Sequence, residues 1–219
     1  MNRHIAIDGP AGAGKSTIAK AVAKKKGLIY VDTGAMYRAF GLYLLRQQVD
    51  VNDQDAVIAA CERADVSIAF ENNEQVVLLN GENVNGQIRT EEVGNMASAC
   101  STIPRVREIM VERQQQIARE KDVIMDGRDI GTVVLPDAKT KIYLTASSKV
   151  RAKRRYDELK EKGVDCDLKK IEADIIERDE RDMNRAASPL RQADDAILVD
   201  TSDLSIDEVI AKILELSDG

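Results

Sequence analysis

The stretch Gly9-Pro10-Ala11-Gly12-Ala13-Gly14-Lys15-Ser16 decides the fold of this 219-residue chain. It matches G-x-x-x-x-G-K-[ST], the phosphate-binding P-loop, and it stands in the context that this motif requires. Residues 4–8 before it predict a short buried strand, and residues 17–26 after it predict a helix. Glycines let such a loop fold tightly around an anion, so that its N–H groups and the helix N-terminus point at phosphates.

Two side chains of the loop have predicted roles toward a nucleoside triphosphate. Lys15 is expected to reach the β- and γ-phosphates, and the Ser16 hydroxyl is expected to hold Mg²⁺. A dinucleotide-binding loop is the nearest alternative, and it requires G-x-G-x-x-G. Counting from Gly12 puts Thr17 where the third glycine should stand, and counting from Gly9 fails at the second glycine. The dinucleotide alternative is therefore excluded.

The composition is that of an ordinary globular protein, with 43% hydrophobic and 32% charged residues. There are 32 Lys and Arg residues against 38 Asp and Glu residues, and the net charge is −6. This balance argues against a dense nucleic-acid or anionic-membrane binder, although not against a small basic pocket. No run of about 18 apolar residues predicts a membrane span. No signal-peptide pattern precedes the first strand, and we expect a cytoplasmic protein.

Cysteine and histidine offer little for catalysis. Cys61, Cys100 and Cys166 are far apart and lack metal-ligand or C-x-x-C spacing, so we interpret them as thiols in a reducing compartment. The single histidine, His4, opens the first strand. A mechanism with a histidine base and a histidine-rich metal site are therefore both excluded.

The rest of the chain alternates short strands with helices. Four further core strands are predicted, at 28–31, 123–126, 142–144 and 196–199. Helices between them predict a parallel sheet that binds ligands at the carboxyl ends of its strands. A period-two pattern predicts a small antiparallel insert at 66–70, 75–79 and 82–84. The predicted fold is α/β, a P-loop NTPase with a five-stranded parallel sheet, helices on both faces, this β insert and two strongly charged helices at about 149–162 and 168–185.

Charged residues mark the predicted ligand-binding edge of the sheet. Asp126 ends an apolar strand, as a Mg²⁺-holding aspartate does, although many buried strands end in aspartate for reasons of turn geometry. Arginine suits phosphoryl transfer because its planar fork neutralises phosphate oxygens in pairs. Ordinary ion pairs within the helix at 168–185 are the alternative interpretation for its arginines. The arginines around this edge are Arg38, Arg105, Arg107, Arg128, Arg151, Arg154, Arg155, Arg178, Arg181 and Arg185.

Taken together, these motifs resemble the bacterial cytidylate kinases over essentially the whole chain. The segments that carry the resemblance are the P-loop 9–17, DTGAMYR at 32–38, PRVR at 104–107, DGRDIGT at 126–132 and RDERDMNR at 178–185. The resemblance implies transfer of the γ-phosphoryl group of ATP to CMP or dCMP, in pyrimidine nucleotide metabolism. It also implies a single kinase domain over 1–219, with a nucleoside-monophosphate-binding region at 34–118, a helical lid at 148–183 and a P-loop core.

The resemblance further implies roles for individual residues. ATP would be bound by Gly9, Pro10, Ala11, Gly12, Ala13, Gly14, Lys15, Ser16 and Thr17, and by the lid residues Arg151, Arg154 and Arg155. Cytosine and its phosphate would be held by Thr33, Arg38, Arg107 and Asp129, the acceptor phosphate by Arg128, the sugar by Arg178 and Asp182, and phosphates by Arg185. Catalysis would fall to Lys15, Arg128 and Arg185, and Mg²⁺ binding to Ser16 and Asp126.

Hydrogen-bond chemistry offers a physical check on the base. Cytosine presents an N4 donor beside its N3 acceptor, which a carboxylate beside a guanidinium complements. Asp129 with an arginine would therefore select cytosine. With uracil the carboxylate would face the O4 acceptor, and an unpaired polar group costs about 1–3 kcal/mol, which predicts a roughly tenfold or greater preference for CMP.

Three alternatives remain open. One is a P-loop kinase for another small acceptor such as UMP. A regulatory GTPase or ATPase switch is the second, but the guanine-reading N-K-x-D motif is absent from the sequence. The third is a non-catalytic interaction protein, which the intact Lys15, Ser16, Asp126 and Arg128 argue against. Nothing in the sequence demands more than a monomer.

Overall fold

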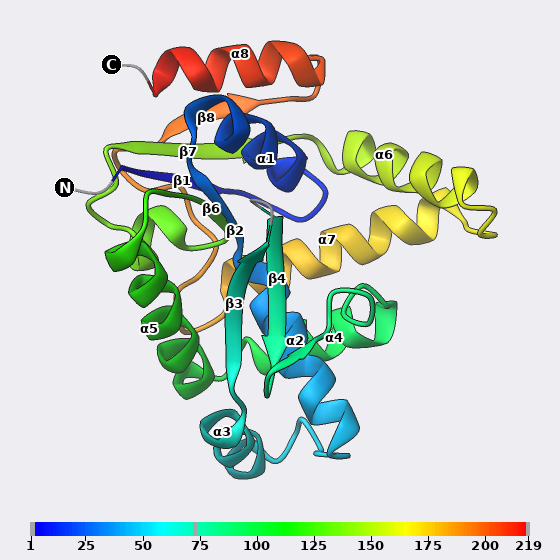
Figure 1. Cartoon of the computed structure of the whole chain (residues 1–219). Coiled ribbons are helices and arrows are strands. Elements are labelled where there is room, and N and C mark those ends of the chain that lie inside the picture. The colour runs from blue at the N-terminus through cyan, green and yellow to red at the C-terminus, as the bar shows by residue number, and fades with distance from the viewer. Residues whose placement is uncertain (1–2, 72–73, 218–219) are drawn as a thin grey trace.

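The computed structural model describes residues 3–71 and 74–217, and it confirms the predicted α/β architecture (Figure 1). Five parallel strands form the main sheet in the order β2-β6-β1-β7-β8. These strands are β1 (His4–Asp8), β2 (Ile29–Asp32), β6 (Val123–Gly127), β7 (Thr140–Thr145) and β8 (Ile197–Asp200). Because β1 is the central strand, the P-loop leaves the sheet between the ends of β6 and β7.

The ends of the strands are level with one another at the carboxyl edge. Asp8 of β1 is in register with Gly127 of β6, and Asp32 of β2 is in register with Asp126 of β6. The turns that follow β1, β2 and β6 therefore begin side by side, although they are far apart in the sequence.

Helices cover both faces of the main sheet. They are α1 (Lys15–Lys26), α2 (Thr33–Arg46), α3 (Gln54–Arg63), α4 (Glu91–Cys100), α5 (Pro104–Glu120), α6 (Ser148–Glu161), α7 (Leu168–Asn184) and α8 (Ile206–Leu216), with a π-helical turn η1 (Ile130–Val134). Alternate residues of a strand face opposite sides of a sheet. Ile7 of β1 thus packs with Val22 of α1 and Val209 of α8, whereas Ala6 packs with Ala118 of α5 on the other side.

The β insert forms a second, antiparallel sheet as predicted. Its strands are β3 (Val66–Glu71), β4 (Glu74–Leu79) and β5 (Glu82–Asn83), and the connection at 72–73 between the first two lies outside the described residues. This sheet shares a separate hydrophobic core with α2, α3 and α5, in which Phe40 and Val77 are buried. Figure 1 shows β3 and β4 in cyan and teal beside α2, and β4 also contacts β2 of the main sheet.

The charged helices α6 and α7 pack against each other and extend to one side of the sheet (Figure 1). Few of their residues are buried, among them Arg151, Ala152, Ile175 and Asp179. The lid and the monophosphate-binding region, with the boundaries given above, stay predictions. Within the part of the chain that the structure describes, no helix is long and apolar enough to cross a membrane.

Some local features differ from the sequence expectations. Helix α1 begins at Lys15 rather than at Thr17, because Gly14 at φ 89° already serves as its N-cap. The turn η1 was not expected, since five residues are too short to show a helical period. Strand β8 lies at the sheet edge, and it therefore exposes Ile197 and Leu198 to solvent.

Candidate active site

The P-loop requires its glycines for two different physical reasons. Gly9 has φ 149°, and a Cβ there would lie 1.9 Å from the backbone oxygen of Leu144 in β7. Gly12 and Gly14 have φ 75° and 89°, which residues with a side chain rarely adopt. The motif therefore needs glycine at position 9 because β7 approaches closely there, and at positions 12 and 14 because the backbone is left-handed there.

Lys15 is buried beneath the loop. Its Nζ donates hydrogen bonds of 2.8 Å to the carbonyl oxygens of Gly9 and Pro10. Burial, together with the positive charge of Arg128, lowers the pKa of Lys15 to about 7, although the carboxylate of Asp126 opposes the shift. The ammonium group is thus held by neutral acceptors, and a bound polyphosphate would favour its charged form.

Ser16 and Asp126 come together as predicted for a magnesium site. The Ser16 hydroxyl donates to Asp126 Oδ2 at 3.1 Å, and the Tyr30 hydroxyl donates to Oδ1 at 2.7 Å. Burial, and next the negative charge of Asp32, raise the pKa of Asp126 to about 6. Mg²⁺ prefers oxygen ligands and is commonly held by one or two carboxylates plus substrate phosphates, so this pair of side chains fits it.

The N-terminus of α2 continues the site from the end of β2. Asp32 caps the helix by accepting a hydrogen bond of 2.9 Å from the Ala35 N–H, and its other carboxylate oxygen pairs with Arg89 at 2.8 Å. The Thr33 hydroxyl donates to the backbone oxygen of Asp126 at 2.8 Å. The cap therefore places the Thr33 hydroxyl at the meeting point of β2 and β6.

Three distant segments meet in a network of buried ion pairs. Arg107 of α5 pairs with Asp129, which follows β6, and Arg185 lies 3.9 Å from the same carboxylate. Arg128 Nε donates to Asp182 of α7 at 2.8 Å, and Arg185 lies 3.8 Å from Asp182. These residues were predicted to hold CMP, and the fold brings them together from α5, the turn after β6 and α7.

Arg38 and Arg178 leave surplus positive charge beside this network. Burial and repulsion by Arg128 lower the pKa of Arg178 to about 10, and its buried Nε has no hydrogen-bond partner among the described residues. Burial also lowers the pKa of Arg38, to which repulsion from Arg89 contributes. Guanidinium groups that repel one another in a partly desolvated site are arranged for an anion such as a phosphate.

The three predicted lid arginines lie in different surroundings. Arg151 donates to the backbone oxygen of Ala11 in the P-loop at 2.9 Å and to Asp179 at 2.5 Å. Arg154 instead donates to the hydroxyl and backbone oxygen of Thr201. Arg155 makes an exposed pair with Glu158. The structure thus brings Arg151 alone of the three to the P-loop by a hydrogen bond, and ATP contacts by the other two stay predictions.

Comparison with known proteins agrees with this geometry. The family model for cytidylate kinase matches residues 5–218. The chain belongs to the cytidylate kinase family.

Individual cytidylate kinases resemble the chain over nearly its whole length. The cytidylate kinase of Caldicellulosiruptor saccharolyticus is 52% identical over 97% of this chain and 94% of its own. That of Bacillus velezensis is 51% identical over 97% of this chain and 95% of its own. A shikimate kinase structure from Bacteroides thetaiotaomicron aligns over 99% of both chains with a TM-score of 0.51, and at 14% identity it supports the fold alone. The chain is thus a nucleoside monophosphate kinase, as its sequence predicts.

Sequence reasoning gave no role to two tyrosines of this kinase site. The ring of Tyr37 lies 5.4 Å from the Arg107 guanidinium carbon, and its hydroxyl is buried without a hydrogen-bond partner among the described residues. Tyr30 holds Asp126, as described above. Tyr30 lies in the strand predicted at 28–31, where an aromatic side chain is explained as a core residue. Tyr37 lies in the DTGAMYR segment at 32–38, in which roles were expected only for Thr33 and Arg38. Neither position carries a sequence signal for contact with Asp126 or Arg107.

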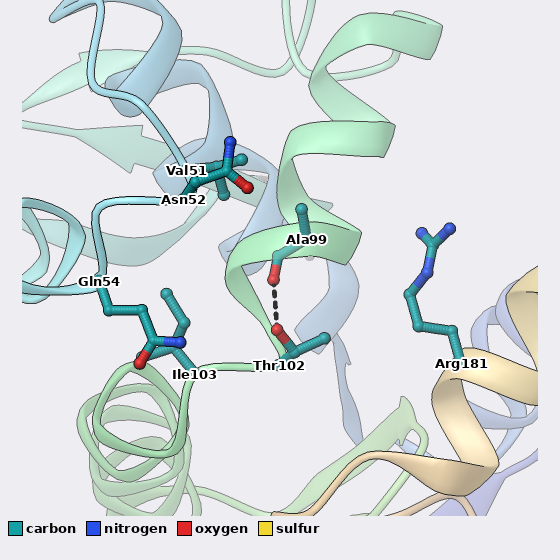
Figure 2. A pocket seen from close by; sticks show the side chains of 7 residues that line it. All are labelled: Val51, Asn52, Gln54, Ala99, Thr102, Ile103 and Arg181. Carbon is teal, nitrogen blue, oxygen red and sulfur yellow. Dashed lines mark hydrogen bonds between the residues drawn. The ribbon is translucent and has the colours of Figure 1, made fainter.

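A cavity of about 430 Å³ lies apart from the kinase site (Figure 2). Figure 2 shows Ala99 and Thr102 at the end of α4 facing Arg181 of α7 across it. Its other lining residues are Val51, Asn52, Gln54 and Ile103. None of these is a predicted catalytic, ATP-binding or CMP-binding residue. The cavity is therefore not the candidate active site.

Proposed function

We propose that this cytidylate kinase family member transfers the γ-phosphoryl group of ATP directly to the phosphate of CMP or dCMP, with Mg²⁺, giving ADP and CDP or dCDP. The observation that carries the proposal is that two groups of buried cationic side chains lie at one sheet edge, each suited to an anion. The P-loop with Lys15 forms one, and the buried cluster around Arg128 forms the other. Arg128 influences the pKa of Lys15, so the two sites lie within electrostatic reach of each other.

On the donor side, the loop N–H groups and Lys15 would bind the β- and γ-phosphates. Ser16 and Asp126 would hold Mg²⁺, whose chemistry at this point is to neutralise charge on those phosphates. Arg151 would close over the loop, which it already contacts at Ala11. Positioning and charge neutralisation account for most of the catalysis of phosphoryl transfer, so this side needs no histidine base.

On the acceptor side, Arg38, Arg128 and Arg185 would neutralise the phosphate of CMP and the group in transfer. Arg178 and Asp182 would reach the sugar. Asp129, held by Arg107, would accept a hydrogen bond from the cytosine amino group. The Nε of Arg107 is buried without a hydrogen-bond partner among the described residues, which supports a donor role toward the base.

The test is acceptor-dependent ADP production, measured in a coupled assay with CMP, dCMP and UMP. Wild-type enzyme should prefer CMP to UMP, and Asp129→Ala should raise the KM for CMP and erode the preference with little change in the KM for ATP. Asp129→Asn is the matched variant, because an amide can donate to uracil O4. An unchanged CMP/UMP ratio in both variants would contradict the assignment of Asp129.

Turnover with another monophosphate and none with CMP would support the alternative acceptor, for instance UMP. An ATPase or GTPase switch would hydrolyse or retain nucleotide without any acceptor, whereas this kinase should await CMP. We further propose a cytoplasmic monomer. Size-exclusion chromatography with light scattering would test the monomer, and cell fractionation would test the compartment.

A further inference from the structure

Asp8 is a buried carboxylate that the proposed chemistry leaves without a role. It ends β1 directly before Gly9, and its exposed fraction is 4%. Its Oδ1 accepts a hydrogen bond of 2.7 Å from the Ile130 N–H, and its Oδ2 accepts one of 2.7 Å from the Gly131 N–H. Burying a charge is unfavourable unless it is well hydrogen-bonded. This arrangement therefore calls for an explanation beyond packing.

The two hydrogen bonds define the backbone on one side of Arg128 and Asp129. The other side is also fixed at Asp8, because Gly127 of β6 is in register with it in the sheet. The Arg128-Asp129 pair is thus a two-residue span between two points that Asp8 holds, one through the β1–β6 ladder and one through its side chain. Each of the two residues ends in a buried ion pair, with Asp182 and Arg107 respectively.

Close contacts leave this span little freedom. A Cβ on Gly127 would lie 2.7 Å from Ile130 Cδ1 and 2.8 Å from the Thr33 hydroxyl oxygen. A Cβ on Gly131 would lie 3.2 Å from Lys141 Cδ, at the end of a flexible side chain, and 3.3 Å from Asp8 Oδ2. A shift of the Asp8 carboxylate would therefore move the backbone that carries Asp129.

We propose that Asp8 is a positioning residue for base selection. It holds the Arg128-Asp129 span so that the Asp129 carboxylate is aligned with the amino group of cytosine. This inference rests on the proposed function, in which Asp129 reads the base. A carboxylate is required because two N–H donors need an acceptor on each oxygen. An asparagine offers one acceptor, and its amide NH₂ would oppose the second N–H.

The experiment compares Asp8→Asn with wild-type enzyme for CMP and UMP in the same coupled assay. Asp8→Asn loses one buried hydrogen bond and places its amide NH₂ against a backbone N–H. The CMP/UMP ratio of kcat/KM should therefore fall about tenfold, with a raised KM for CMP. The ratio does not depend on how much of the sample is folded, because both acceptors meet the same active fraction. Val209→Ala is the control, since it removes core volume in α8 and should leave the ratio unchanged.

Gly131→Ala provides a second variant should Asp8→Asn fold poorly. Its new Cβ would press on Asp8 Oδ2 from the η1 side, so the CMP/UMP ratio should fall here as well. A CMP/UMP ratio that stays at the wild-type value in Asp8→Asn, or in Gly131→Ala where the first variant does not fold, would overturn the inference. Wild-type enzyme that does not prefer CMP would instead overturn the proposed function itself.

Discussion

Lys15 on the donor side of the site and two arginines on the acceptor side are held in opposite ways. Lys15 on the donor side is held by two neutral carbonyl oxygens, and burial lowers its pKa to about 7. On the acceptor side, Arg107 and Arg128 are each held by a buried carboxylate. Lys15 is therefore free to respond to an incoming phosphate, whereas Arg107 and Arg128 are fixed in place before any ligand arrives. The arrangement around Lys15 suits charge neutralisation, and the arrangement around Arg107 and Arg128 suits selection among acceptors.

Removing the donor cation should have the largest effect on activity. Lys15→Ala should lower kcat by about 10²–10³-fold for CMP, dCMP and UMP alike, because it removes a preorganised charge at the phosphates. Its thermal unfolding midpoint should stay level or rise, since the buried ammonium donates to two backbone carbonyl oxygens and to no carboxylate of the described residues. The coupled assay and thermal unfolding measure the two effects. A fall in kcat with only one of the acceptors would contradict the assignment of Lys15 to the donor side.

Removing an acceptor cation should instead affect stability. Arg107→Ala leaves the buried Asp129 with Arg185, at 3.9 Å, as its remaining ion-pair partner among the described residues, which should cost up to about 3–5 kcal/mol of unfolding free energy. The KM for CMP should rise as well, while ATP binding changes less. The double variant Arg107→Ala, Asp129→Ala should lose less stability than the sum of the single variants, and chemical denaturation measures this coupling. Strictly additive losses would show that the pair does not act as a unit.

This difference also decides what the sequence could predict. The donor site is contiguous from Gly9 to Ser16, so spacing alone located Lys15 and its loop. The acceptor pairs join residues far apart in the sequence, such as Arg128 with Asp182, and no local pattern says which segments meet. Ion pairs within the helix at 168–185 were the alternative interpretation for its arginines, and Arg181 forms such a pair with Glu177 at i,i+4. The resemblance to a family supplied the other acceptor residues.

The main strands and helices followed from periodicity, but the backbone that positions Asp129 did not. The turn η1 leaves no hydrophobic period, and Asp8 resembles any aspartate at the end of a strand. The hydrogen bonds from Ile130 and Gly131 to Asp8 depend on β1 and β6 being neighbours. Strand order is a property of the whole sheet, and it becomes visible only in the folded chain.

Carboxylates on the two sides should respond to pH with opposite signs. The pKa of Asp126 is raised to about 6, mainly by burial, so the folded state binds the extra proton and stability falls as pH rises from about 4 through 6. Burial also opposes ionisation of Asp182, but Arg128, Arg178 and Arg185 outweigh it and lower its pKa. That carboxylate stabilises the fold above its unfolded-state pKa, and the stabilisation is lost as pH falls through its lowered folded-state pKa.

The measurement is unfolding free energy against pH for ligand-free wild-type, Asp126→Asn and Asp182→Asn. Between about pH 4 and 6, wild-type enzyme should lose about 2–3 kcal/mol relative to Asp126→Asn. Relative to Asp182→Asn it should keep its advantage through this range and lose it only at lower pH. Asp8 titrates in all three proteins, so its contribution largely cancels. If the three curves of unfolding free energy against pH ran parallel, Asp126 and Asp182 would not respond to pH with opposite signs, contrary to the prediction.

The lid arginines should show the smallest and most graded effects. Arg151→Ala should raise the KM for ATP, because it removes the hydrogen bond to Ala11 and leaves Asp179 buried without its guanidinium partner. Arg154→Ala removes hydrogen bonds to Thr201 rather than to the P-loop, so its effect on the KM for ATP should be smaller. Arg155, with 49% of its side chain exposed, should change unfolding free energy by less than about 0.5 kcal/mol when replaced by alanine.

Steady-state kinetics over ATP concentration would rank the three variants. The order Arg151, Arg154, Arg155 follows if the lid acts through the contacts present in this structure. A larger kinetic effect at Arg154 or Arg155 would mean that the helix α6 rotates when ATP binds and presents a different arginine to the phosphates. In that case the arginine that contacts ATP would be set by a movement of α6, and the contrast between the two sides would be restricted to Lys15.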